Sequence, residues 1–166
     1  MNTKKLALTG IFAATAIALS TLENLVPIGA FVPIPGLRLG IANLAIMSTY
    51  YIIGRKSAAS VGIIKVMTVF LTFGNVTSLI ISLCGTVLAF LSLILTEKLT
   101  TRFISFIGVS SCSAAFHSFG QITGACILTG STAPFAVFLP LVLCSVVTGA
   151  LTGFLMNCLY LALDKK

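Results

Sequence analysis

Apolar residues occur along this chain in long runs separated by short polar stretches. Several runs approach the length of about 20 residues that a helix needs to cross a membrane. The second and third are short, and would cross only with help from flanking residues or local thinning of the bilayer. The pattern therefore predicts an all-α membrane protein, one domain over residues 1–166, with six transmembrane helices at 5–25, 39–53, 57–73, 76–96, 103–128 and 135–163.

Composition supports this interpretation, because 58% of the residues are hydrophobic and 8% are charged. A soluble domain of this size would not remain in solution with so few charges. The first run follows two lysines, as in a signal peptide, but Glu23 and Asn24 stand where a cleavage site would have small residues. We therefore expect a retained helix.

The net charge of +7 is distributed as a topology signal and does not indicate nucleic-acid binding. If six helices alternate in direction, eight basic residues fall on one side, and Arg38 alone lies in a connection on the other. Short loops rich in lysine and arginine stay in the cytoplasm, so both termini are predicted to be cytoplasmic. The eight are Lys4, Lys5, Arg55, Lys56, Lys98, Arg102, Lys165 and Lys166.

The five cysteines all fall inside predicted helices, and none forms a CxxC or CxxH spacing. An odd number without such spacings argues against a disulfide framework and against a zinc site. We interpret them as small buried hydrophobic residues and expect neither a metal nor a cofactor.

Small residues form a face on two of the predicted helices, and such faces allow close helix packing in lipid. On the first helix, packing within the bundle and docking of a partner membrane protein remain equally open. On the sixth helix we favour packing within the bundle. The first face comprises Ala7, Gly10, Ala14 and Ala18, and the second Ser145, Gly149, Gly153 and Asn157.

Polar residues share one face of the fifth predicted helix, where His117 and Gln121 lie one turn apart. A lone membrane histidine can simply hydrogen-bond a neighbouring helix. Several polar groups on one face favour the lining of a cavity instead. The face comprises Ser110, Ser113, His117, Gln121 and Gly124.

Lys65 lies mid-way along the third predicted helix, about 12 Å from its outer end at the helical rise per residue. An ammonium at this depth is costly unless it is paired or hydrated. Glu23 is the one acidic residue away from the predicted cytoplasmic face. Lys65 therefore serves as its ion-pair partner, as a counter-charge for a ligand, or as both.

The connection over residues 24–37 contains three prolines and two glycines. Such backbone cannot lie in lipid, so we expect it to fold over the protein or over a water-filled cavity. The other two outer connections are short, so this one is interpreted as a lid. Arg38 and Asn43, at the start of the second predicted helix, would point under it.

Catalytic motifs are missing from the chain. No GxxxxGK[ST] phosphate loop occurs, and the three acidic residues Glu23, Glu97 and Asp164 provide no pair that would hold magnesium against a diphosphate. No nucleophile, base and acid can be assembled around His117. We therefore expect that the chain is not an enzyme.

Two segments carry a family resemblance: PIPGLRLGIANLAIM at 33–47 and AAFHSFGQ at 114–121, together with Glu23 and a basic residue at position 65. The chain resembles, over essentially its whole length, the Gx transporter family, which is also labelled heptaprenyl diphosphate synthase component I. One departure is Lys65, since members more often carry arginine there. Arginine and lysine bind anions with different geometry, which puts the contact at this position in doubt.

This family is similar to the substrate-binding S components of energy-coupling factor (ECF) importers. The resemblance implies a six-helix bundle with cytoplasmic termini, a capped pocket in the outer leaflet, and separate ATPase subunits. It also implies an AxxxA face on the first helix that docks a T component, which Ala14 and Ala18 match. The second label implies prenyl-chain elongation, which without an acidic motif would leave a non-catalytic membrane partner of a soluble synthase.

We therefore expect a multi-pass protein of the bacterial plasma membrane that binds a small anionic metabolite or vitamin-like compound for import. The alternatives are a membrane accessory subunit in isoprenoid or quinone biosynthesis, and a purely structural membrane protein. Basic residues outnumber Glu23 around the predicted site, which favours an anionic ligand. Site residues are expected to be Glu23, Arg38, Asn43, Lys65, His117 and Gln121. Phe31, Phe70, Phe73, Phe116 and Phe119 are placed to provide apolar walls, and some of the five must face lipid instead.

Overall fold

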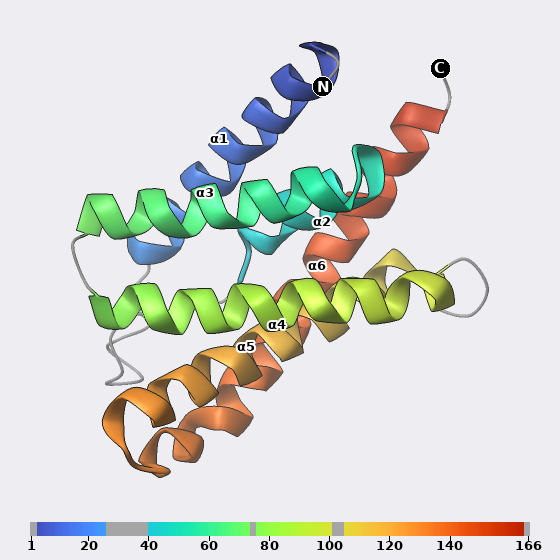
Figure 1. Ribbon diagram of the computed structural model, residues 1–166. Coiled ribbons are helices and arrows are strands. Elements are labelled where there is room, and N and C mark those ends of the chain that lie inside the picture. The colour runs from blue at the N-terminus through green and yellow to red at the C-terminus, as the bar shows by residue number, and fades with distance from the viewer. Residues whose placement is uncertain (1–2, 26–39, 74–75, 101–104, 165–166) are drawn as a thin grey trace.

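The structure is a computed structural model that describes residues 3–25, 40–73, 76–100 and 105–164, and within these ranges it contains helices and no strand. The predicted all-α class with six helices is confirmed (Figure 1). The elements are α1 (Thr3–Leu25), α2 (Asn43–Ile52), α3 (Arg55–Phe73), α4 (Val76–Thr100), α5 (Phe106–Thr129), the 3₁₀ helix η2 (Ala133–Val137) and α6 (Phe138–Asp164).

Three segments of the described chain are long and apolar enough to cross a membrane: Thr3–Glu23, Val76–Glu97 and Ala133–Ala162. They identify a membrane protein. The ten residues of α2 extend only about 15 Å at the helical rise, which is half the hydrocarbon thickness. Polar side chains make α3 and α5 less apolar, so six crossings remain a prediction.

Helices α5 and α6 pack at very short range along the small face of α6. A Cβ at Gly149 would lie 2.7 Å from Ser111 Cα, and one at Gly153 would lie 2.5 Å from Ile107 Cα. The hydroxyls of Ser118 and Ser145 also hydrogen-bond across this interface. The face predicted to pack within the bundle does so, although Asn157 at its end is exposed.

Helix α1 lies against α2 and α3, and it turns its small residues away from them. Ala13 and Ala16 are buried, whereas Ala14 and Ala18 are exposed, as are Ala7 and Gly10. The small face of α1 therefore does not take part in packing within the described part of the chain.

Short helix α2 lies in the middle of the bundle, and seven of its ten residues are buried. At its end, the Tyr50 hydroxyl donates to Glu97 Oε2 at 2.7 Å, and Arg55 forms an ion pair with the same carboxylate. The hydrogen bond to Glu97 raises the pKa of the Arg55 guanidinium. This cluster ties together the ends of α2 and α4 and the start of α3.

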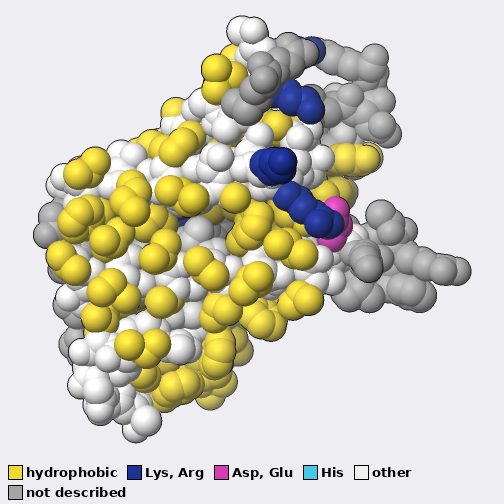
Figure 2. Space-filling view, in the orientation of Figure 1, with side chains coloured by type: hydrophobic (Ala, Val, Ile, Leu, Met, Phe, Trp, Pro, Cys, Tyr) yellow, Lys and Arg dark blue, Asp and Glu magenta, His cyan; other side chains and the backbone are white. Residues whose placement is uncertain are grey.

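The two termini lie toward the same side of the molecule (Figure 1). Figure 2 shows hydrophobic side chains spread over the visible face and Lys and Arg side chains gathered toward one end. The described part of the molecule thus has an apolar flank and a basic end.

Candidate ligand-binding site

The turn before α2 is the centre of the candidate site. Gly40 has a positive φ of 84°, and the turn is closed by hydrogen bonds from Asn43 N to Gly40 O and from Leu44 N to Ile41 O. A Cβ at Gly40 would lie 3.2 Å from both His117 Cδ2 and Asn43 Nδ2. A glycine is required here because the turn presses against α5 in a left-handed conformation.

Glu23, at the end of α1, is buried although it is acidic. Its Oε1 accepts a hydrogen bond from the backbone N–H of Ile41, inside the turn. A carboxylate that accepts from a backbone N–H in a low-dielectric setting makes a strong, charge-assisted bond. Glu23 therefore anchors the turn to α1.

Lys65 of α3 is fully buried, with an exposed fraction of 0%. Its Nζ donates to Asn43 Oδ1 at 3.5 Å, so the ammonium lies beside the first residue of α2. Long amphipathic side chains normally keep the charge in water. The enclosure of this one places a cation in the centre of the bundle.

His117 and Gln121 of α5 are also buried, and their Nε2 atoms lie 2.6 Å apart. The two side chains therefore form a buried hydrogen-bonded pair one helical turn apart. A Cβ at Gly85 of α4 would lie 2.8 Å from both His117 Cε1 and Gln121 Cγ. The missing side chain at Gly85 makes room for the pair.

The structure thus brings together all five of the predicted site residues that it describes, from α1, α2, α3 and α5. Arg38 lies outside the described residues, as does Phe31. The shared centre is the turn at 40–43, which contacts Glu23, His117 and, through Asn43, Lys65. The convergence is structural, and ligand binding by these residues stays a prediction.

Two of the predicted aromatic walls are placed differently. Phe116 and Phe119 are 41% and 40% exposed, so they face outward from the bundle. The Phe119 ring contacts Phe135 and Phe138, with ring centroids 6.5 and 5.9 Å apart. These two phenylalanines are therefore among those that face away from the site, since their side of α5 is turned away from the buried His117.

Sequence reasoning missed two hydroxyls on α4. Ser82 and Thr86 are buried, and within the described part of the chain neither hydroxyl has a hydrogen-bond partner, nor does Asn43 Nδ2. The same spacing argument that singled out the polar face of α5 finds this pair, since they lie one turn apart beside Gly85.

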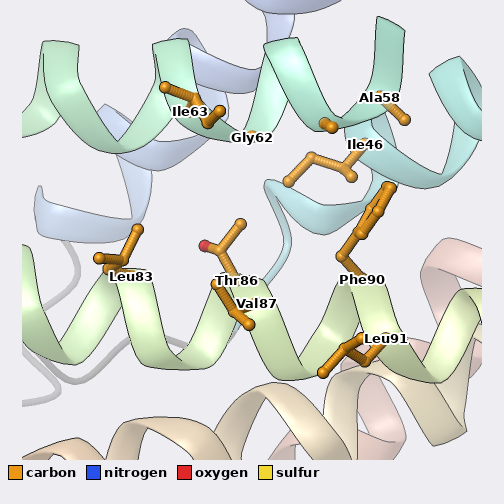
Figure 3. A pocket seen from close by; sticks show the side chains of 10 residues that line it. Ile46, Ala58, Gly62, Ile63, Leu83, Thr86, Val87, Phe90 and Leu91 are labelled. Atoms are coloured by element: carbon orange, nitrogen blue, oxygen red, sulfur yellow. The ribbon is translucent and has the colours of Figure 1, made fainter. Parts of the chain in front are cut away.

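The apolar wall also comes from an unexpected place, a cavity of about 190 Å³ between α3 and α4 (Figure 3). Thr86 contributes to its lining, and Ile46 of α2 closes its inner side. No candidate metal site, meaning three or more clustered His, Cys, Asp or Glu side chains, occurs among the described residues. The arrangement combines buried amides and hydroxyls with one buried lysine and one buried glutamate, which suits the binding of a polar group.

A family model described as heptaprenyl diphosphate synthase component I matches residues 12–159 of the chain. The chain belongs to the heptaprenyl diphosphate synthase component I family. The match contains the whole candidate site, from Glu23 to Gln121. No curated protein and no solved structure matches the chain.

Proposed function

We propose that this member of the heptaprenyl diphosphate synthase component I family is a substrate-binding subunit of an ECF-type importer. The observation that carries the proposal is the convergence of buried Glu23, Asn43, Lys65, His117 and Gln121 around one turn. Ionisable and amide side chains are expensive inside a membrane protein, and they usually mark a ligand or ion path. A purely structural bundle does not need this concentration of polar groups.

The proposed ligand is anionic. Lys65 and Glu23 bring one charge of each sign, and the sequence between Glu23 and Gly40 adds Arg38 without adding an acidic residue. Arg38 is expected at the site from the sequence, and with it the basic groups would outnumber the acidic one, a surplus that a carboxylate or phosphate of the ligand would balance. Asn43 and Gln121 would orient that group through hydrogen bonds.

In this proposal the chain crosses the bacterial plasma membrane several times with both termini in the cytoplasm. The basic residues Lys4, Lys5, Arg55 and Lys56, which begin α1 and α3, support that orientation. The site turn, which lies at the opposite end of α1 from its basic start and beside the middle of α3, would then lie toward the outer leaflet.

The proposed partners are a T component and separate ATPase subunits, and the chain itself catalyses no reaction. The exposed small face of α1, with Ala14 and Ala18, supports docking of a partner helix at backbone distance. No ATP-binding loop occurs in the sequence, so the energy for import would come from the partner subunits.

The second candidate function is that of a non-catalytic membrane subunit in isoprenoid or quinone biosynthesis. The family's description as heptaprenyl diphosphate synthase component I favours it, and so does the apolar cavity between α3 and α4. Co-purification separates the two proposals, because an importer subunit captures a T component and ATPases, whereas an accessory subunit captures a soluble prenyl synthase.

The ligand assignment is tested by purifying the protein and identifying by mass spectrometry the small molecules that come with it. We expect an anionic compound, and we expect Lys65→Met to weaken its binding by roughly 30-fold, or about 2 kcal/mol. Lys56→Met is a matched control on the same helix, since Lys56 is exposed. A cationic ligand, or equal binding to Lys65→Met and wild type, would show that the buried charges are structural.

A further inference from the structure

The cavity between α3 and α4 opens on the apolar flank of the molecule. Its inner side is formed by Ile46, Gly62 and Thr86, which are buried. Its rim consists of exposed hydrophobic residues that frame the opening in Figure 3, namely Ile63, Leu83, Val87 and Leu91. In a membrane such a rim contacts lipid, so the cavity is accessible from the side of the protein.

The volume shows that the cavity accommodates part of a ligand. Pockets that enclose a complete small-molecule ligand have volumes of roughly 300–1,000 Å³. This one measures about 190 Å³ and its lining is almost entirely apolar. The rest of any occupant must lie outside the cavity.

The inner side of the cavity borders the candidate ligand-binding site. Ile46 lies three residues after Asn43 on α2, and Gly62 lies three residues before Lys65 on α3. Residues three or four apart share one face of a helix, so each of these cavity residues is a neighbour of a site residue on its own helix. Thr86 follows Gly85, which lies against His117 and Gln121. The cavity and the polar site therefore border each other along α2, α3 and α4, with the Ile46 side chain at the inner side of the cavity.

Of the two orphan hydroxyls, Thr86 lines the cavity, and Ser82 lies one helical turn before it on α4. A helical serine or threonine often bonds the carbonyl one turn back, as Thr96 does to Ser92 O at 2.7 Å. Thr86 and Ser82 are buried without any partner in the described part of the chain. Figure 3 shows the Thr86 side chain rising from α4 between the two helices. An unsatisfied buried hydroxyl is costly, which points to a ligand oxygen at this place.

We propose that the groove between α3 and α4 binds the hydrocarbon chain of an amphiphile whose phosphate head occupies the candidate site. Thr86 and Ser82 then hydrogen-bond the oxygen that links head and chain. The ligand enters sideways from the bilayer. This inference rests on the proposed anion-binding role of Lys65 and adds the class of ligand and the route of entry.

The groove adds selectivity more than it adds affinity. A hydrocarbon chain leaves an environment as apolar as the groove, so transfer from lipid gains little from the hydrophobic effect. The head group and the linking oxygen must therefore provide most of the binding free energy, while the groove admits only chains of suitable width.

Photo-cross-linking in lipid nanodiscs tests the proposal. The probe is dodecyl phosphate carrying a diazirine in mid-chain, and the control probe is the same alcohol without phosphate. We expect the phosphate probe to label the α3 and α4 residues around the groove at least tenfold more strongly than other apolar faces. The alcohol should label all lipid-facing surfaces to a similar extent. If the phosphate probe also labels those surfaces evenly, without preference for the groove, the proposal is overturned.

Variants separate the groove from the polar site. Ala59→Phe places a large side chain in the cavity and should reduce groove labelling at least tenfold. Val87→Phe blocks the cavity from its exposed rim without changing the core, and it should have the same effect. Ala162→Phe on the exposed end of α6 is the matched control. If both folded plugs are labelled like wild type while Lys65→Met loses phosphate binding, the groove is wrong and the proposed function stands.

Two further outcomes complete the test. Undiminished groove labelling of Lys65→Met would remove the phosphate head from the candidate site and overturn this proposal together with the anionic ligand of the proposed function. Nanodiscs of phosphatidylglycerol, compared with phosphatidylcholine, distinguish the source of the ligand. If phosphatidylglycerol displaces the probe from the groove, the ligand is a bulk anionic lipid. If labelling of the groove persists, the ligand is a single-chain phosphate. Both ligands have the proposed chemistry.

Discussion

At the scale of single residues, Gly40 shows how backbone conformation and packing together determine the turn before α2. Gly40 adopts a φ of 84°, and its α-hydrogen side faces His117 and Asn43 at distances that leave little room for a methyl group. A side chain here meets both a strained backbone and two crowded neighbours. The conformation of one glycine thus decides whether the turn can reach α5.

Gly40→Ala is expected to destabilise the protein by about 1–3 kcal/mol, because an L side chain is strained at this φ. Thermal unfolding in detergent measures the effect. Gly10→Ala is the matched control, since a Cβ at Gly10 meets nothing within 4 Å and the residue is helical. The control should be neutral or stabilising by about 0.5–1 kcal/mol. Equal stability of Gly40→Ala and wild type would contradict the crowded turn.

At the scale of helices, small residues do opposite things on α1 and α6. Gly149 and Gly153 of α6 bring its backbone against α5, whereas Ala14 and Ala18 of α1 face away from the chain. The sequence does not distinguish the small faces of α1 and α6, because each places small residues three or four positions apart. Only one of the two faces is used inside the described structure, which leaves the other available to a partner.

Replacing Ala14 and Ala18 together by leucine should abolish co-purification with a co-expressed T component while the protein stays folded. A leucine side chain separates helices that meet through backbone contact. Size-exclusion chromatography and pull-down measure both effects. Gly153→Leu serves as the contrast, since its side chain would collide with Ile107 and should loosen the bundle itself. Unchanged assembly of the double variant would place the docking surface elsewhere.

At the scale of the whole molecule, charge and apolar surface are arranged as a membrane requires. Exposed hydrophobic side chains cover the flank, while Arg55 and Lys56 are exposed near one end. The Tyr50, Arg55 and Glu97 cluster holds that end together. The site turn lies at the other end of α1, beside Glu23, and reaches the middle of α3 at Lys65. This arrangement of charge predicts which end of the molecule faces the cytoplasm and which end faces the outside of the cell.

Labelling of single cysteines tests that prediction in a background without the five native cysteines. Ser131→Cys, at the exposed connection after α5, should react with an impermeant thiol reagent only from outside the cell. Lys56→Cys should react only from inside. Modification of residue 131 only from inside would invert the topology and place the candidate site at the cytoplasmic face.

The properties of a lipid bilayer explain which features of this protein can be predicted from its sequence. The six helices are encoded locally, because a chain in a bilayer must satisfy its backbone hydrogen bonds within each apolar run. Glu23, Lys65 and His117 were also recognisable, since polar groups in such helices turn toward one another. The family resemblance added Ala14 and Ala18 as a docking face, which the structure leaves exposed.

Tertiary packing decided the rest. Gly120 lets α5 approach the backbone of α4 at Cys84, whereas α3 and α4 leave a cavity beside Gly62. Nothing local distinguishes these two interfaces, since each has glycine on an apolar helix. Which helices pack against each other also decides that the Ser82 and Thr86 hydroxyls are left without partners and that Phe116 faces outward. Sequence by itself determined which segments are helical and which groups must avoid lipid, and packing between distant helices determined where space remained for a ligand.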